Sequence, residues 1–365
     1  MMMLFFEPME QPQVKTAPVV GAARAKQLDR LTVFRGLAAL MVFAYHVYHV
    51  TGWSSKSWVA SYGFVGVAFF FCLSGYVLRY TWRNTEGART FYARRFAKVY
   101  PLHFVTGIAA LVFGLNSLHL VWPAVIPNFL LLQAWVPVDE IAFGVNSVSW
   151  SLSCEAFFYL GAPFVFAYLR RTSTRNAVLA VLVWWAACSA VSICFGVSGS
   201  AFDVGAYTNP LLRSGEFGLG VLAAELHSRR WRPKGPLWVY GLVVAATLVA
   251  LTRLSTPQTI ADVAVTLPVL GVIVVSADRD LSGVRTILTS KLLVFAGNAS
   301  FAFYLVHEQV LNFYVRIFGH GASGPRGVFL ILCALGTSMV LASVLHLFLE
   351  KPVQRWILRH TLRSQ

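Results

Sequence analysis

The stretch LTVFRGLAALMVFAYHVYHV, Leu31 to Val50, decides the fold. A run of about 20 apolar residues, rising about 1.5 Å per residue, is long enough to cross the ~30 Å hydrocarbon core of a bilayer. Arg35 and His46 interrupt the run eleven positions apart, so they share one face of a helix, about 16 Å apart along its axis. Ionisable groups at membrane depth are costly and by default mark a functional site. The alternative is that Arg35 reaches the headgroups and His46 hydrogen-bonds to a neighbouring helix.

Similar apolar runs recur along the rest of the chain. The 365 residues are 57% hydrophobic and 12% charged, which is about half the charged fraction of a soluble domain. The pattern predicts an all-α polytopic membrane protein with about ten transmembrane helices. We expect the spans at 31–50, 60–80, 97–115, 150–169, 177–196, 210–227, 236–252, 260–277, 292–315 and 327–348.

The net charge of +15 follows this predicted topology. With a cytoplasmic N-terminus, 23 of the 30 Lys and Arg residues fall in cytoplasmic segments and four fall in external loops. Basic residues collect on the side that is not translocated, so we expect both termini in the cytoplasm and no nucleic-acid partner. Residues 1–27 are polar and lack a signal-peptide pattern. We expect a disordered tail over 1–27, a membrane domain over 28–352 and a basic tail over 353–365.

No metal is expected. The five cysteines stand singly in apolar runs, without the C-x-x-C or Cys/His spacing of metal sites. Such residues usually pack as small hydrophobic side chains within helices.

The fourth span carries a polar stripe, because Ser151, Glu155 and Tyr159 follow each other at intervals of four residues. A carboxylate at this depth needs a partner on another helix. His46 is predicted at a comparable depth, and a carboxylate that orients an imidazole is a common arrangement for a general base. A structural ion pair is the alternative. His307, in the ninth span, adds a second imidazole, and two histidines with a carboxylate predict a site.

A basic cluster, FYARRFAKVYP, stands where the third span enters the membrane. Arg94, Arg95 and Lys98 lie within one turn or so of each other, beside a helix N-terminus. Cations in this position bind phosphates well. The alternative is an ordinary cluster of positive-inside residues.

The segment between 116 and 148 is the longest external loop. Within it, WPAVIPNFLLLQAWVP, Trp122 to Pro137, is apolar but is broken by prolines and is short for a span. We expect a re-entrant or interfacial segment that shapes an acceptor site.

Two further groups of charges are expected to be structural. Arg213 and Glu216 are three residues apart in the sixth span, which predicts a local salt bridge. Glu350 and Lys351 follow the last span, where they are expected to cap and anchor the helix.

Seven motifs, taken in order, make the chain resemble the membrane acyltransferase-3 family over nearly all residues after 30. They are LTVFRGLAALMVFAYH, GVAFFFCLSGY, YARRFAKVYP, WSLSCEAFFYL, the stretch Arg213 to Gly220, GNASFAFYLVH and LEKP. The chain departs from the family pattern at three positions. Thr32 and Ala68 stand where acidic residues are common, and Lys98 replaces the second Arg of the basic pair.

The resemblance implies transfer of an acyl group, usually acetyl, from cytoplasmic acyl-CoA to a hydroxyl of an extracytoplasmic acceptor, often a sugar. It gives the catalytic role to His46, with Glu155 and His307 on the acceptor side. It links Arg35 and the basic cluster to the donor. The full set of expected site residues is catalytic His46, Glu155 and His307, donor-binding Arg35, Arg94, Arg95 and Lys98, and acceptor-binding Trp150, Ser151, Tyr304 and Arg213.

We therefore expect a multi-pass enzyme of a bacterial inner membrane. It would use acetyl-CoA or another acyl-CoA and a glycan or lipid-linked sugar, such as an exopolysaccharide. His46 would act as a general base, or would carry the acyl group covalently. A small lipid or a secondary metabolite is the alternative acceptor. A non-catalytic transporter of an acylated product is a different class, which paired inverted halves with broken helices would support; the sequence does not show them.

Overall fold

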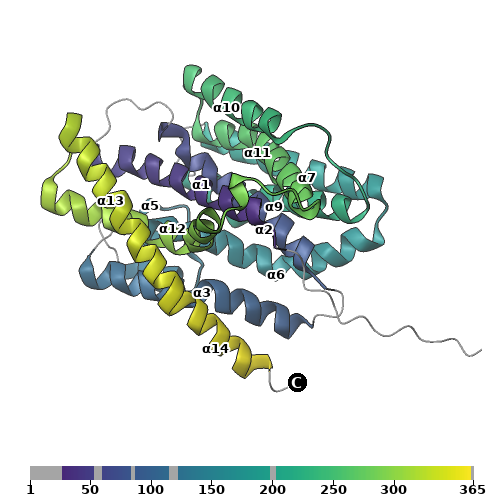
Figure 1. Ribbon diagram of the computed structural model, residues 1–365, viewed down its shortest axis with the longest axis horizontal. Coiled ribbons are helices and arrows are strands. Elements are labelled where there is room, and N and C mark those ends of the chain that lie inside the picture. Colours follow the sequence, from purple (N-terminus) through teal and green to yellow (C-terminus); the bar gives the residue numbers. More distant parts are fainter. Residues whose placement is uncertain (1–26, 53–59, 84–86, 115–121, 198–202, 363–365) are drawn as a thin grey trace, which may run out of the picture.

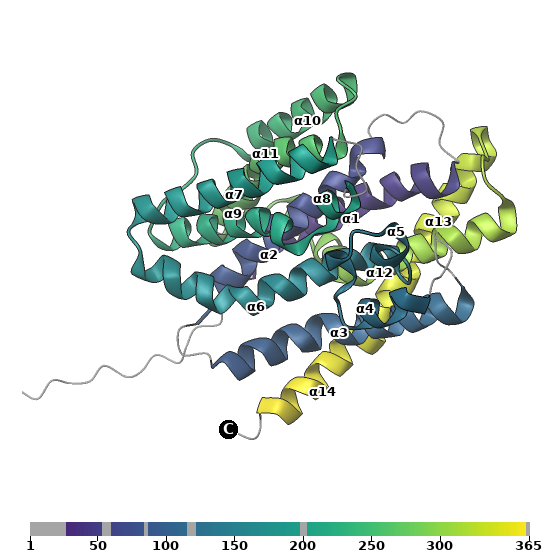
Figure 2. The same cartoon turned by 180° about the vertical axis from the view of Figure 1, so that it is seen from behind.

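The chain folds into a bundle of helices, which a computed structural model describes over residues 27–52, 60–83, 87–114, 122–197 and 203–362. Every regular element in these ranges is a helix (Figures 1 and 2). The all-α polytopic fold expected from the apolar runs is thereby confirmed.

Each predicted span overlaps one long helix. The ten helices are α1 (Asp29–His46), α2 (Gly66–Thr81), α3 (Ala88–Phe113), α6 (Trp150–Arg171), α7 (Thr174–Gly196), α9 (Pro210–Ser228), α10 (Leu237–Arg253), α11 (Gln258–Leu281), α12 (Lys291–Phe318) and α13 (Gly324–Leu345). The first continues as a π-helical turn, η1 (Val47–Thr51), and a 3-10 turn, η2 (Ala60–Val65), leads into α2.

Seven helical stretches of the described chain are long and apolar enough to cross a membrane. They correspond to α1, α2, α3, α6, α7, α11 and α13 with their helical extensions. The helix α10 is apolar but has 17 residues. Helices α9 and α12 bury charged or polar groups, including Arg213, Glu216, His307 and Glu308. Such groups lower the hydropathy of these two helices, as expected where polar residues face a bundle interior.

The last helix of the described chain extends beyond the end at 348 that was expected for the last span. From α13 the helix continues through the π-helical turn η7 (His346–Glu350) into α14 (Lys351–Leu362). The continuous stretch Gly324–Thr361 has 38 residues, about 57 Å at 1.5 Å per residue and therefore longer than a bilayer core. Its end, α14, lies along α3 (Figures 1 and 2). The expected boundary at 353 falls inside α14, and residues 1–26 lie outside the described ranges.

The segment around Trp122 to Pro137 is broken into short helices, as its prolines predict. These are η3 (Trp122–Ala124), α4 (Val125–Phe129) and η4 (Gln133–Trp135), followed by α5 (Asp139–Ala142). Two buried amides fix the segment to the turn η5 (Ser147–Ser149) before α6. The Nδ2 of Asn128 donates to Ser149 Oγ at 3.0 Å, and the Nε2 of Gln133 donates to the Ser149 carbonyl at 3.0 Å.

Glycines allow the central helices to approach closely. A Cβ on Gly297 of α12 would lie 2.2 Å from the carbonyl oxygen of Thr32 in α1. A Cβ on Gly220 of α9 would lie 1.9 Å from the carbonyl oxygen of Cys72 in α2. Side chains at these two positions are therefore excluded, in keeping with the small residues that membrane helices use where their backbones meet. The contact at Gly297 joins the two helices that carry His46 and His307.

Candidate active site

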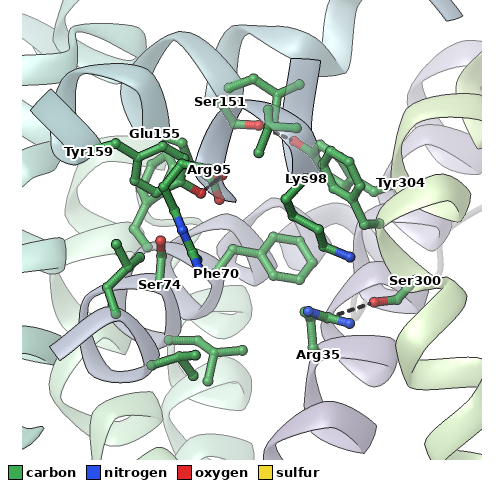
Figure 3. A pocket seen from close by; sticks show the side chains of 17 residues that line it. Arg35, Phe70, Ser74, Arg95, Lys98, Ser151, Glu155, Tyr159, Ser300 and Tyr304 are labelled. Atoms are coloured by element: carbon green, nitrogen blue, oxygen red, sulfur yellow. Dashed lines mark hydrogen bonds between the residues drawn. The ribbon is translucent and has the colours of Figure 1, made fainter. Parts of the chain in front are cut away.

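Two cavities lie on either side of one tyrosine. The inner cavity, about 150 Å³, is lined by side chains of α1, α2, α3, α6 and α12 (Figure 3). The outer cavity, about 440 Å³, is lined from α1, η1, η2, α5, η5, α8 (Asp203–Thr208), α11 and α12, among others. Tyr304 of α12 lines both cavities. We call the first cavity inner because it contains Arg35, near the end of α1 that the topology assigns to the cytoplasm.

The inner cavity is basic. It is lined by Arg35, Arg95 and Lys98 (Figure 3). The guanidinium of Arg35 is held against α12, since its Nε donates to Ser300 Oγ at 3.0 Å and its Nη2 donates to the Gly297 carbonyl at 2.7 Å. The Nε of Arg95 is buried and has no hydrogen-bond partner within the described part of the chain. Three cations around a small cavity are a suitable seat for phosphates.

Lys98 has a carboxylate partner that corrects one expectation. Glu350, expected to cap the last helix, is 3% exposed and forms an ion pair with Lys98. Its other oxygen, Oε2, lies 2.8 Å from Nδ1 of His346, one turn earlier in η7. A π-helical turn often marks a functional segment, and here it contains both His346 and Glu350, the second of which contacts Lys98 of the inner cavity. Glu350 therefore positions Lys98.

Arg94 is the expected donor residue that does not line the inner cavity, although its neighbour Arg95 does. Successive residues of a helix point about 100° apart, so one side chain of a neighbouring pair can line a cavity while the other points elsewhere. The pair consequently offers a matched comparison of cavity and non-cavity cations.

Glu155 lies in the inner cavity, and this corrects its expected contact with His46. Its Oε2 accepts a hydrogen bond from the Tyr159 hydroxyl at 2.5 Å, along the polar stripe of α6. Both side chains line the inner cavity on the side of Arg95 (Figure 3). The stripe was predicted correctly, but it faces the basic cluster, whereas His46 lines the outer cavity.

The two predicted histidines meet. The Nε2 of His307 lies 3.0 Å from Nδ1 of His46. The other nitrogen of His307, Nδ1, faces the carbonyl oxygens of Tyr304 at 2.8 Å and Phe303 at 3.2 Å, so it must carry the proton and donate. The unprotonated Nε2 of His307 then accepts from His46 Nδ1, which also faces the Val42 carbonyl at 3.0 Å. His46 is thereby held with Nε2 unprotonated, as a general base requires.

The carboxylate beside His46 is Glu308. Its Oε2 lies 3.7 Å from Nε2 of His46 and accepts a hydrogen bond from the Ser147 hydroxyl. The side chain of Glu308 is 5% exposed, and that of His46 is 17% exposed. Glu308 lies within the ninth expected span, 292–315, but no role was expected for it. Its position directly after His307 was the signal, although neighbouring residues of a helix point about 100° apart and only the structure shows that both reach His46.

The predicted acceptor residues divide between the cavities. Trp150 lines the outer cavity and Ser151 lines the inner one. The hydroxyl of Tyr304 lies 3.0 Å from Ser151 Oγ (Figure 3) and donates to the Val148 carbonyl at 3.1 Å. Phe70 of α2 packs edge-on against the Tyr304 ring, with centroids 5.4 Å apart. These contacts make Tyr304 the partition between the two cavities.

Arg213 lines neither cavity. It is 4% exposed and pairs with Glu216 at 3.3 Å, as predicted, and with Asp262 of α11 at 2.6 Å. Its guanidinium also stacks within 6 Å of the rings of Trp150 and Tyr207, which line the outer cavity. Arg213 therefore supports the wall of the outer cavity from behind. The helix α11 supplies the second carboxylate.

Two further cavities adjoin the inner and the outer cavity, one on each side. A cavity of about 220 Å³ shares Arg35, Leu73 and Val77 with the inner one and reaches Gln27 and Leu28 before α1. On the other side, a groove of about 370 Å³ shares Tyr45, His49, Phe64 and Gln258 with the outer one. Within the described residues, no group of three or more His, Cys, Asp or Glu side chains has the arrangement of a metal site.

Comparisons with known proteins identify the family of the chain. The model of a family described as an acyltransferase domain, acyltransferase-3, matches residues 28–347. Acyltransferase MdmB of Streptomyces mycarofaciens is 34% identical, over 91% of this chain and 93% of its own. A putative O-acetyltransferase of Staphylococcus aureus strain COL is 22% identical over 92% of this chain and 59% of its own. Peptidoglycan O-acetyltransferase OatA of Listeria monocytogenes is 27% identical, over 46% of this chain and 28% of its own. No solved structure matches.

Proposed function

The chain belongs to the acyltransferase-3 family and is an acyltransferase of the membrane, and from this premise we propose a donor, an acceptor and a route between them. The donor is cytoplasmic acyl-CoA, in the first place acetyl-CoA, because several relatives are named as O-acetyltransferases. The acceptor is a hydroxyl of an extracytoplasmic or lipid-linked glycan, and the membrane is a bacterial inner membrane.

One observation carries the proposal: a basic cavity and a cavity containing paired histidines adjoin at Tyr304. Arg35, Arg95 and Lys98 bind the donor phosphates, which charge-assisted hydrogen bonds favour. The pantetheine arm, on the order of 15–20 Å when extended, matches the roughly 16 Å of helix rise between Arg35 and His46. Tyr304 moves aside as the thioester passes from the inner to the outer cavity.

The transfer step uses His46 as its base. Nε2 of His46 takes the proton of the acceptor hydroxyl while the oxygen of that hydroxyl attacks the carbonyl carbon of the thioester. A carbon–oxygen bond forms, the carbon–sulfur bond breaks, and the proton passes from Nε2 to the leaving thiolate, so that the products are an ester and free CoA. His307 keeps His46 in the required tautomer, and Glu308 stabilises the transient imidazolium. General acid–base catalysis of this type contributes about 10²- to 10⁴-fold.

The test is hydrolysis of acetyl-CoA by the purified full chain in nanodiscs, with donor binding measured in parallel. Wild type is compared with His46→Ala and with the control His360→Ala, which alters an exposed histidine of α14. We expect the wild type and the control to bind acetyl-CoA and release CoA slowly. His46→Ala should bind the donor but lose at least 10²-fold in turnover.

Two results would count against the proposal. If His46→Ala turns over like the wild type, His46 is not the base. If the wild type binds no acyl-CoA, the basic cluster acts only in membrane topology, and a non-catalytic transporter of an acylated product becomes the better explanation.

A further inference from the structure

The Asp, Glu, Lys and Arg side chains that line the outer cavity have a net charge opposite in sign to those that line the inner one. Its described lining residues include three carboxylates, Asp139, Asp203 and Glu308, and no Lys or Arg. The inner cavity is lined by three cations and one carboxylate, Glu155. A cavity lined by one sign of charge, between low-dielectric walls, concentrates ligands of the other sign. The acceptor cavity therefore favours a cation.

Aromatic rings strengthen this preference. The described lining of the outer cavity contains six of them, from Tyr45, Phe64, Phe143, Trp150, Tyr207 and Tyr304. The face of an aromatic ring attracts an organic ammonium group, and several rings beside a carboxylate form a suitable enclosure for one. Sugars also stack on aromatic rings, so the carboxylates are the feature that separates a charged acceptor from a neutral one.

The three carboxylates divide into two groups. Glu308 is engaged by Ser147 and lies beside His46, so it belongs to the reacting end of the cavity. Asp139 begins α5 and Asp203 begins α8, and these two short helices pack against each other. Partial burial and neighbouring Glu140 raise the pKa of Asp139 above its ordinary value. A bound cation would lower that pKa again, so cation binding at Asp139 relieves an unfavourable charge environment.

We propose that the acceptor carries a positively charged amine, bound by Asp139 with Asp203 while the acceptor hydroxyl lies at His46. This inference rests on the proposed function, because it identifies the chemical class of the alcohol that His46 activates. The cavity of about 440 Å³ continues into the groove of about 370 Å³. The amine is accordingly one substituent of a larger hydroxylated molecule, such as an aminated sugar or an amine-bearing natural product.

The experiment compares two alcohols of the same shape and different charge. Choline carries a trimethylammonium group, and 3,3-dimethylbutan-1-ol carries a tert-butyl group in its place. Neither of these groups can itself be acylated, so only the hydroxyl reports transfer. Ester formation from acetyl-CoA is measured with the full chain in nanodiscs at neutral pH, for wild type, Asp139→Asn and Asp139→Asn/Asp203→Asn. The matched control is Glu140→Gln, because Glu140 is the adjacent exposed carboxylate and does not line the outer cavity.

The readout is the ratio of kcat/KM for choline to that for dimethylbutanol. Comparing this ratio between variants cancels the different partitioning of the two alcohols into lipid. We expect Asp139→Asn to lower the ratio about three- to tenfold, as one partly screened charge should, and the double variant to lower it further. Glu140→Gln should keep the wild-type ratio.

Each other outcome overturns a defined statement. If the ratio is the same in wild type and in both Asp variants, or if neither alcohol is esterified, while His46-dependent hydrolysis of acetyl-CoA persists, the amine inference fails and the proposed function stands. If hydrolysis does not depend on His46, the proposed function fails and the inference fails with it.

Discussion

Arg94 and Arg95 are adjacent residues with different surroundings, and they allow a sharp test of the donor site. Only Arg95 of this pair lines the inner cavity. Both substitutions, Arg95→Gln and Arg94→Gln, remove one cation from the same basic segment, so their effects on membrane topology should be equal. We expect Arg95→Gln to raise the Kd for acetyl-CoA by about 10-fold or more, the size expected for a lost charge-assisted contact.

Arg94→Gln should change that Kd by less than about threefold, measured by isothermal titration on the same nanodisc preparations. Equal losses in the two variants would show that the segment acts through its net charge alone, without a defined phosphate site. Larger loss in Arg94→Gln would place the donor outside the inner cavity.

At the scale of residues, sequence reasoning identified side chains better than it identified their neighbours. His46, His307 and Tyr304 were all expected at the site, and the contact of the two histidines follows from their depths in two helices. The expected contact of Glu155 with His46 was wrong, because helical periodicity defines a face of a helix and leaves open which other helix that face meets. Glu308 and Asp262 were missed for the same reason: each makes its important contact across the bundle.

At the scale of elements, the contact between α1 and α12 positions the catalytic pair. Gly297 permits this contact, since an added Cβ would lie 2.2 Å from the Thr32 carbonyl oxygen. Gly297→Ala should push the helices apart, lower stability by about 1–3 kcal/mol as overpacking does, and reduce turnover by separating His46 from His307. The control is Gly336→Ala in α13, where nothing lies within 4 Å of the added Cβ. It should be neutral, or more stable by about 0.5–1 kcal/mol.

The stability of both variants is measured by thermal unfolding in detergent, with the monodisperse fraction on size exclusion as the readout. Their turnover is measured as acetyl-CoA hydrolysis. A Gly297→Ala protein with wild-type stability and turnover would mean that the helices adjust without cost.

The helices themselves were predictable, because apolar runs of bilayer length admit few other structures. The ends of the helices were less predictable, because α14 continues the last helix beyond the end at 348 that was expected for the last span.

At the scale of the whole molecule, cavities follow one another from one end of the bundle to the other. The cavity of about 220 Å³ reaches Gln27 before α1 and adjoins the inner cavity, which is lined by Arg95. The outer cavity, which is lined by His46, follows next and adjoins the groove of about 370 Å³, which reaches Ser255 in the turn after α10. Neighbouring cavities share lining residues at each junction, with Tyr304 between the inner and the outer cavity. No sequence pattern contains this order, since each cavity is assembled from helices far apart in the chain.

This order predicts a sided reaction. Acetyl-CoA is highly charged and does not cross a bilayer, so it should reach the inner cavity only from the side of the basic segments. In sealed inside-out vesicles, added acetyl-CoA should be hydrolysed in a His46-dependent manner. In sealed right-side-out vesicles the same addition should give less than about a tenth of that rate until detergent opens them, and orientation is established by protease access to a C-terminal tag. A higher rate in the sealed right-side-out vesicles than in the sealed inside-out ones, with orientation confirmed, would mean that the donor enters from the other end. The basic cavity would then have to serve the acceptor, and the assignment of the two cavities would have to be exchanged.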